Sequence, residues 1–375
     1  MTNPIQGVRH VFDIVKAARD NQNPFSDEMI QQLLDATVSD EKIRSRYNNF
    51  SKGYSAEELF RRIFSLLPWV RLITPLGQEQ YPEVSKQNLQ TPDYEITYEV
   101  GSQRELKKIL VEVKLVDGNK QSFELLKNTY EVLKNYEDSS PHPLVFAVFW
   151  RNRLQWTINS IEAFSEKSSC YKISYEQACL NDLSAVFGDY SYVFRKPIYR
   201  KSRFSNIKNH RSKYYHNHEK YGQTIYEGIS LDGKKYKEII SIETPVIDSA
   251  FNFEQINYKK LNSRRIEIVE KVILNDSVYV YKLSSLILGF LMKIYYYNKD
   301  DMYYQDNFIV ENAFNIVDTV RRTCGGEKFY LLPQNKQEKT RNLMKDQFGN
   351  APHIYKMYNS NELLDGPILC SHEPF

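Results

Sequence analysis

The chain has 375 residues, of which 41% are apolar and 26% charged, and this ordinary globular composition excludes a fibrous or largely disordered protein. Its four cysteines show no metal-ligand spacing and are too few for a disulfide framework. The net charge is +3, but residues 195–220 contain nine Lys or Arg and one acidic residue, so this segment carries +8 and the remainder −5.

Four short helices are predicted at the start of the chain, at residues 5–20, 27–36, 39–47 and 55–67. Ser26 is a suitable N-cap for the second helix, because acidic residues and an apolar stripe follow it. Ser55 can cap the fourth helix, with Glu58 at the capping-box position, and Pro68 ends it.

A compact α/β unit is predicted next, with strands at 93–100, 106–116, 144–150 and 154–158 and an amphipathic helix at 122–136. The second strand places Val111, Val113 and Leu115 on one face. Residues 144–150 are continuously apolar, which is typical of a buried strand, and a short turn leads from them into the last strand as a hairpin.

The pattern changes after about residue 165. Residues 190–245 have weak periodicity, whereas 263–297 and 307–323 are predicted to be helical, the second ending at Gly325. We therefore predict a domain 1–165 and a mostly helical accessory domain 166–375. No apolar run is long enough to cross a bilayer and no signal-peptide core is visible at the start, so we expect a cytoplasmic protein without a membrane partner.

The most informative residues are Asp93, in Thr91-Pro92-Asp93, and the Glu112-Val113-Lys114 string nineteen residues later. Glu112 and Lys114 are two apart in a strand, so they project from the same face. Two charged groups on so apolar a strand are costly to bury without a purpose. An acid from a neighbouring strand would complete a Mg²⁺ or Mn²⁺ site with Glu112, and Lys114 would orient a water or stabilise a charged phosphate. The alternative is a solvated Glu/Lys pair on an exposed sheet face.

These residues and their order of elements resemble the core of the PD-(D/E)XK nuclease superfamily, in its restriction-endonuclease-like and junction-resolvase-like branches. The resemblance covers residues 53–158 and implies a mixed central sheet flanked by helices. It also implies that Asp93, Glu112 and Lys114 are catalytic and that the two acids bind the metal ion.

A further glutamate often precedes the first strand of this superfamily, four residues after a glycine, and Gly53 and Glu57 match that spacing. The resemblance thus implies Glu57 as an additional catalytic and metal-binding residue. Helical geometry does not separate Glu57 from Glu58, and Glu57 could instead pair with Arg61 on the helix surface. The resemblance also places Lys120 and Gln121, just after the second strand, where polar residues approach the phosphate.

The basic segment 195–220 alternates cations with aromatic residues, a pattern suited to phosphate contact and base stacking. A solvated charged loop is the alternative interpretation. Three histidines in this segment lack the neighbours needed for a zinc site. The cations predicted to bind nucleic acid are Arg200, Lys201, Arg203, Lys208, Arg211 and Lys213.

We therefore predict a metal-dependent endonuclease that hydrolyses phosphodiester bonds of DNA, in restriction or anti-phage defence. Two alternatives stay open. One is a sequence-specific, type II-like restriction enzyme, and the other is a catalytically silent nucleic-acid-binding or scaffold protein of a defence complex. The C-terminal domain would recognise the substrate or mediate a homodimer or a partner-protein contact.

Overall fold

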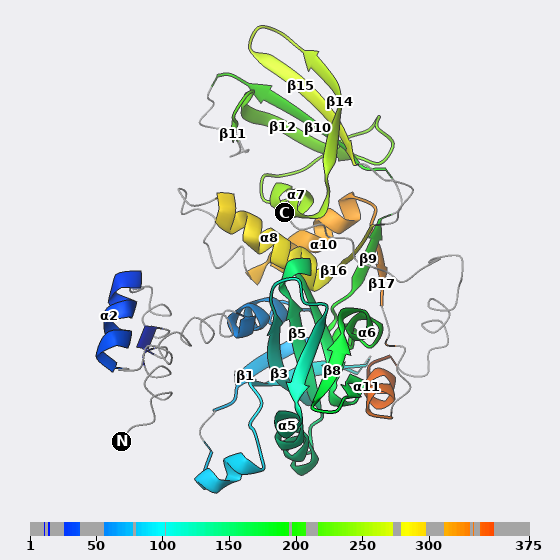
Figure 1. The fold of residues 1–375 in the computed structure, drawn as a ribbon. Coiled ribbons are helices and arrows are strands. Elements are labelled where there is room, and N and C mark those ends of the chain that lie inside the picture. The colour runs from blue at the N-terminus through cyan, green and yellow to red at the C-terminus, as the bar shows by residue number, and fades with distance from the viewer. Residues whose placement is uncertain are drawn as a thin grey trace.

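The computed structural model describes residues 11, 14–15, 26–37, 56–77, 80–101, 103–194, 197–207, 217–272, 279–297, 311–330, 333 and 338–348. Three parts follow one another along the molecule (Figure 1). They are an α/β unit around β3 (Glu105–Val116) and β5 (Leu144–Trp150), a layer of helices around α8 (Leu283–Tyr297), and a curved sheet containing β10 (Tyr199–Ser205) and β15 (Arg265–Val272). The predicted helix 39–47 and most of helix 5–20 lie outside the described residues.

The α/β unit is built on a five-stranded sheet with strand order β1-β2-β3-β5-β6. The pair β3–β5 is parallel and the other three pairs are antiparallel, so the sheet is mixed, as predicted. The four predicted strands are confirmed within a few residues. The strands are β1 (Val70–Pro75), β2 (Tyr94–Val100), β3 (Glu105–Val116), β5 (Leu144–Trp150) and β6 (Gln155–Ser160).

The two faces of this sheet are covered by different elements. On one face, Val111 and Val113 of β3 pack in a core with Phe60 of the helix at residues 56–64. On the other face, Leu110 of β3 packs in a second core with Leu133 of α5 (Lys127–Ser139). Because alternate residues of a strand face opposite sides, Glu112 and Lys114 lie on the α5 side of the sheet.

A small second sheet, with order β4-β8-β7, covers part of the same side. The prediction of one helix over 122–136 is wrong for its first turn, because residues 122–126 form β4 and pair with β8. The predicted boundary after residue 165 falls inside β7, whose partner β8 is bonded to β4. The elements are β4 (Ser122–Leu126), β7 (Ser165–Glu166), β8 (Cys170–Ser174) and the following helix α6 (Tyr175–Leu180).

The prediction of a mostly helical C-terminal part is wrong between residues 191 and 282. Strands β11-β12-β10-β15-β14 form a sheet with β13 attached to β12, and β16-β9-β17 form another. These strands are β9 (Ser191–Phe194), β10 (Tyr199–Ser205), β11 (Asn217–His218), β12 (Gly222–Ser230), β13 (Lys237–Glu238), β14 (Phe253–Lys260), β15 (Arg265–Val272), β16 (Tyr279–Lys282) and β17 (Glu327–Phe329). In β15 the apolar Ile266, Ile268 and Val272 recur at even spacing, which suits a strand better than the helix predicted there.

The C-terminal helices pack against the α/β unit and complete its apolar core. Phe290 of α8 is buried in the same core cluster as Phe60, so the α/β unit and the C-terminal helices share one apolar interior. No helix among the described residues is long and apolar enough to span a membrane. The helices are α2 (Asp27–Thr37), α7 (Thr244–Ala250), α8 (Leu283–Tyr297), α10 (Ala313–Thr323) and α11 (Glu338–Phe348), and the single 3-10 turns are η1 (Glu83–Gln87), η2 (Arg151–Arg153), η3 (Ile161–Ala163) and η4 (Ser184–Phe187).

Two of the predicted helices near the termini are confirmed. Helix α2 has the predicted cap, since the backbone N–H of Met29 donates to Ser26 Oγ at 3.3 Å. Helix α10 lies within the predicted range 307–323 and ends at Thr323, just before the two glycines.

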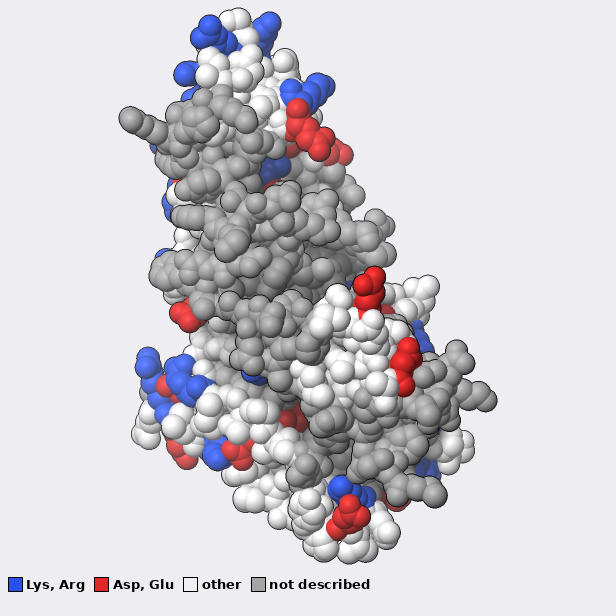
Figure 2. All heavy atoms as spheres, turned by 90° about the vertical axis from the view of Figure 1, so that its left-hand side faces the viewer, with Lys and Arg blue, Asp and Glu red and all other residues white. Residues whose placement is uncertain are grey.

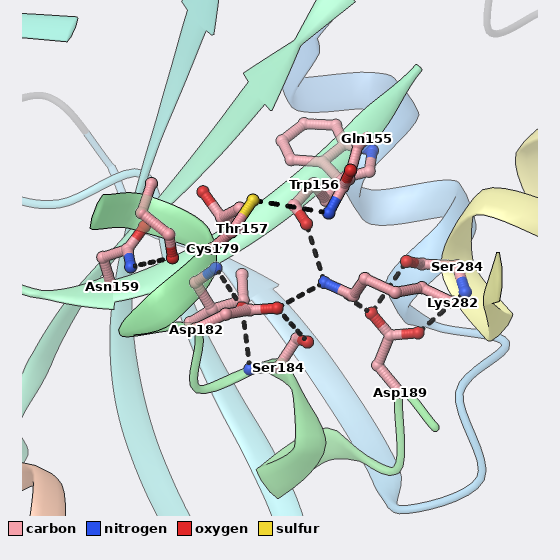
Figure 3. Close-up of polar contacts among 12 residues, drawn as sticks. Gln155, Trp156, Thr157, Asn159, Cys179, Asp182, Ser184, Asp189, Lys282 and Ser284 are labelled. Atoms are coloured by element: carbon pink, nitrogen blue, oxygen red, sulfur yellow. Dashed lines mark hydrogen bonds and ion pairs between the residues drawn. The ribbon is translucent and has the colours of Figure 1, made fainter. Parts of the chain in front are cut away.

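A buried polar cluster fastens β16 to the α/β unit (Figure 3). Lys282 Nζ, on a side chain that is 3% exposed, donates to Asp182 Oδ2 at 2.6 Å and to the Trp156 carbonyl oxygen at 2.7 Å. It also lies 3.3 Å from Asp189 Oδ2, and Asp189 accepts two further hydrogen bonds from Ser284. The cluster therefore links residues about a hundred positions apart through charges that are almost entirely buried.

Candidate active site

Asp93 stands directly before β2 and is held by its neighbours on both sides. Its Oδ2 accepts a hydrogen bond of 2.7 Å from the backbone N–H of Val113 in β3. Its carbonyl oxygen accepts another from the N–H of Leu76, which follows β1. The next residue, Tyr94, donates from its hydroxyl to the Glu57 carbonyl oxygen at 3.3 Å, which ties the helix at 56–64 to this end of the sheet.

Glu112 is the most deeply buried acid of the site, with 1% of the residue exposed. Its Oε1 accepts hydrogen bonds from Lys114 Nζ at 2.5 Å and from Gln90 Nε2 at 3.2 Å. Its Oε2 is buried and has no hydrogen bond of normal geometry to any described residue, although the backbone N–H of Asp93 is near enough to the carboxylate to lower its pKa. A buried carboxylate oxygen without a partner carries a large desolvation cost, which a bound cation would offset.

Burial and the neighbouring charges shift the pKa values of all three charged side chains at the site. Burial raises the pKa of Glu112 to about 7, with Asp93 adding to the rise and Lys114 opposing it. Burial likewise raises the pKa of Asp93 against the opposing effect of Lys114. Burial also disfavours the Lys114 ammonium, but Glu112 and Asp93 outweigh it and raise the pKa of Lys114, which therefore stays charged at neutral pH.

The donor set suits Mg²⁺ or Mn²⁺ in one specific respect. Mg²⁺ commonly uses one or two protein carboxylates and takes its other ligands from water and phosphate. Asp93 and Glu112 would supply two, and the unpartnered Oε2 of Glu112 is a ready oxygen ligand. Among the described residues, no three His, Cys, Asp or Glu side chains are gathered closely enough to hold a metal ion on their own.

Glu57 and Glu58, which the sequence alone does not separate, have different surroundings. Glu58 binds Arg61 at 2.6 Å and Arg62 at 2.8 Å. Arg61, the alternative partner predicted for Glu57, thus pairs with the neighbouring glutamate. The charge of Glu57 is near enough to contribute to the raised pKa of Lys114 and of Tyr94. Glu57 thus lies at the border of the site, where the helix at residues 56–64 approaches it.

Gln90 is a site residue that the sequence analysis missed. Its N–H donates to the Val132 carbonyl oxygen in α5 at 3.2 Å, so α5 positions the side chain that reaches Glu112. In the sequence, the only indication that Gln90 belongs to the site is its position three residues before Asp93. Of the two polar residues predicted after β3, Lys120 is exposed and Gln121 Oε1 accepts a hydrogen bond from Arg153 at 3.0 Å.

The predicted nucleic-acid contacts on β10 are largely engaged inside the protein. Arg200 binds Asp248 at 2.6 Å and Glu270 at 2.7 Å, with its side chain 15% exposed. These acids hold Arg200 against the sheet, so it is less available to a phosphate than predicted, and its role as a phosphate contact stays a prediction. Arg203 pairs with Glu267 at 2.7 Å, and Lys201 lies over the ring of Tyr236. The remaining three, Lys208, Arg211 and Lys213, lie outside the described residues.

Comparison with known proteins finds one weak structural similarity and no match by sequence. No protein-family model and no curated protein matches it. Among solved structures, it is similar to a Holliday junction resolvase from Archaeoglobus fulgidus, an archaeal hyperthermophile, with 16% sequence identity and a TM-score of 0.27. The match covers 36% of this chain and 96% of the resolvase.

Proposed function

We propose that this protein is a metal-dependent endonuclease that hydrolyses phosphodiester bonds of DNA. The observation that carries the proposal is the position of Asp93, bonded to the Val113 N–H beside the paired Glu112 and Lys114 of β3, together with a buried Glu112 oxygen that lacks a partner among the described residues. A solvated Glu/Lys pair would not bury its carboxylate.

Each side chain has a distinct role in the proposed reaction. Asp93 and Glu112 would hold Mg²⁺ or Mn²⁺, with Glu57 as a further acid at the border of the site. When bound, such an ion supplies activation of water and stabilisation of negative charge on the phosphate. Lys114, kept as an ammonium by its two acidic neighbours, would stabilise the charge that develops on the attacked phosphate. Gln90 would keep Glu112 oriented.

DNA as the substrate, and restriction or anti-phage defence as the setting, follow from the resemblance of the motif to the PD-(D/E)XK superfamily. RNA carries the same phosphodiester, so the test of the proposal has to include it. A catalytically silent scaffold is the less favoured alternative, because both acids and the lysine are present, with Lys114 paired to Glu112 and Asp93 bonded to the residue between them.

The deciding experiment incubates the pure protein with linear, circular and single-stranded DNA and with RNA, in the presence of Mg²⁺, Mn²⁺ or EDTA. Lys114→Ala is the inactive variant. Lys108→Ala, on the same strand but in an exposed pair with Glu95, is the matched control. We expect cleavage with either metal ion, none with EDTA or Lys114→Ala, and normal cleavage with Lys108→Ala. Metal-independent cleavage, or equal cleavage by the Lys114 variant, would overturn the proposal.

A further inference from the structure

The curved sheet at the far end of the molecule presents a second set of cations that the sequence analysis did not single out. Residues 255–266, which run from β14 through its turn into β15, contain four basic residues and no acidic one. They are Lys259, Lys260, Arg264 and Arg265, and all four are exposed. Figure 2 shows Lys and Arg atoms at the upper end of the molecule, which is the end that carries the β14–β15 turn in Figure 1.

These cations differ from those in the body of the same sheet. There, Arg200 and Arg203 are bound by Asp248, Glu267 and Glu270. None of the four cations at the turn makes an ion pair with any residue that the structure describes. Exposed cations that have no acidic partner in the described part of the chain leave a local positive potential there, which is the property needed to attract a polyanion.

Aromatic rings lie at the same end of the sheet, on the face that Tyr258 shares with Lys260. Lys259 and Arg265 project from the other face, where Lys259 is opposite Glu267. Tyr258 of β14 is 48% exposed, and its ring centroid is 6.1 Å from that of Tyr221, which precedes β12. Tyr221 in turn lies 4.5 Å from the His218 ring and 5.8 Å from the Phe204 ring. The buried Phe204 thus supports a row of rings that reaches the surface at Tyr258, and burial of so large an exposed ring against a ligand would be favourable.

The backbone pairing brings the rings and cations to the same end of the sheet. Arg265, the first residue of β15, is opposite Ser205, the last residue of β10. Ser205 is also opposite Gln223, two residues after Tyr221. We define the hairpin-end surface as Tyr221, Tyr258, Lys259, Lys260, Arg264 and Arg265, which surround this end of the sheet from both faces and from the turn.

We propose that the hairpin-end surface binds single-stranded nucleic acid, with phosphates on the four cations and bases stacked on the tyrosine rings. Combined cations and exposed aromatic rings suit a strand with accessible bases, whereas a duplex keeps its bases stacked inside. The proposal rests on the proposed nuclease function for the identity of the polyanion. It adds that the enzyme holds an unpaired strand on a surface separate from its catalytic residues.

The test measures binding without cleavage, using the full-length Lys114→Ala protein in EDTA and a labelled DNA strand of about 16 nucleotides. The charge variants are Lys259→Gln/Lys260→Gln and Arg264→Gln/Arg265→Gln. The matched control is Lys234→Gln/Lys235→Gln, which removes two exposed cations from the turn after β12, at the opposite end of the same sheet. Tyr258→Leu removes the ring but keeps an apolar side chain, and Tyr81→Leu, in an 81% exposed residue outside this sheet, is its control.

We expect each charge variant to weaken single-strand binding at least about tenfold near 0.1 M salt and to lower the slope of log affinity against log salt by about 1.4. We expect Tyr258→Leu to weaken it by about tenfold with the slope unchanged. Both controls should bind normally. Duplex DNA of the same length should bind more weakly and should not respond to Tyr258→Leu.

Equal effects of the charge variants and their control would overturn the assignment of the surface. Tighter binding of duplex, or no effect of Tyr258→Leu, would overturn the single-strand assignment. A labelled RNA strand that binds as tightly as DNA, with the same response to the variants, would support the proposal. Because catalysis is absent from this assay, failure of the proposed nuclease activity would leave the binding result intact, and loss of binding would leave the cleavage result intact.

Discussion

The backbone N–H of Val113 donates a hydrogen bond of 2.7 Å to Asp93 Oδ2, so the residue between Glu112 and Lys114 fixes the acid of the neighbouring strand. The contact needs β2 and β3 in their observed antiparallel register, in which Tyr94 is opposite Val111. A shift of one residue would turn Glu112 and Lys114 to the other face of the sheet. The relative positions of Asp93, Glu112 and Lys114 therefore depend on the register of β2 against β3.

This contact allows the charge of Asp93 to be removed without loss of its hydrogen bond. In Asp93→Asn the amide oxygen can still accept from Val113, so we expect cleavage to fall at least about 100-fold while the melting temperature is unchanged or higher. The measurements are cleavage rate and thermal unfolding. Glu95→Gln, two residues along and paired with the exposed Lys108, is the control and should cleave normally. Normal cleavage by Asp93→Asn would exclude Asp93 from the reaction.

Glu112→Gln tests the metal site through stability. Because the folded-state pKa of Glu112 is raised above 4.5 to about 7, the folded protein binds more protons, and its metal-free stability should fall as pH rises through that interval. Mg²⁺ competes with the proton, so it should stabilise the protein more at pH 8 than at pH 5.5. At free Mg²⁺ ten times the dissociation constant, the gain is about 1.4 kcal/mol.

The Gln variant should lose both the fall in stability with pH and the response to Mg²⁺. Chemical denaturation with and without Mg²⁺ at the two pH values measures this. Addition of Ca²⁺ or Na⁺ at matched ionic strength separates specific binding from screening. A Mg²⁺ effect that is the same in the variant and in the unaltered protein would place the metal site elsewhere.

The strands that carry the site could be predicted because their pattern is local. β2 alternates buried and half-buried residues, and β5 is apolar throughout. Residues 122–126 misled the prediction, because Phe123 and Leu126 fit a helical spacing as well as they fit β4. Strand β15 was missed for a related reason. Its run of Ile and Glu residues precedes the apolar helix α8, and the prediction joined the two into one helix over 263–297.

The partners of charged residues could not be predicted, because they lie far apart in the chain. Arg200 and the rest of the basic segment were identified by charge alone. The acids that bind Arg200 are Asp248 of α7 and Glu270 of β15, and only the folded chain places them beside it. Gln90 reaches Glu112 from 22 positions away, with no motif to mark it.

Two adjacent glutamates offer a direct test of the fourth acid of the site. We expect Glu57→Gln to lower metal-dependent cleavage by about tenfold or more, because its charge contributes to the environment of Lys114. Glu58→Gln should leave cleavage unchanged and cost about 0.3–0.5 kcal/mol of stability for each lost arginine pair. Cleavage assays and denaturant unfolding of both variants give the comparison. A reversed pattern would show that Glu58, rather than Glu57, serves the site.

The buried Lys282 predicts a pH-dependent loss of stability. Burial raises the pKa of Asp189, and Lys282 opposes that rise, so in Lys282→Met the aspartate should hold its proton to a higher pH. A raised folded-state pKa lowers stability as pH rises from the ordinary value near 3.8 through the folded value. The variant should therefore be destabilised by about 3–5 kcal/mol at pH 8 and by less at pH 5, as measured by urea unfolding.

Adding Asp189→Asn to Lys282→Met removes one of the buried charges that lost their partner. The double variant should recover part of the stability at pH 8 and depend less on pH, because less uncompensated charge remains in the core. If Lys282→Met loses the same free energy at pH 5 and pH 8, the lysine acts by packing and by its bond to the Trp156 carbonyl oxygen rather than by compensating Asp189.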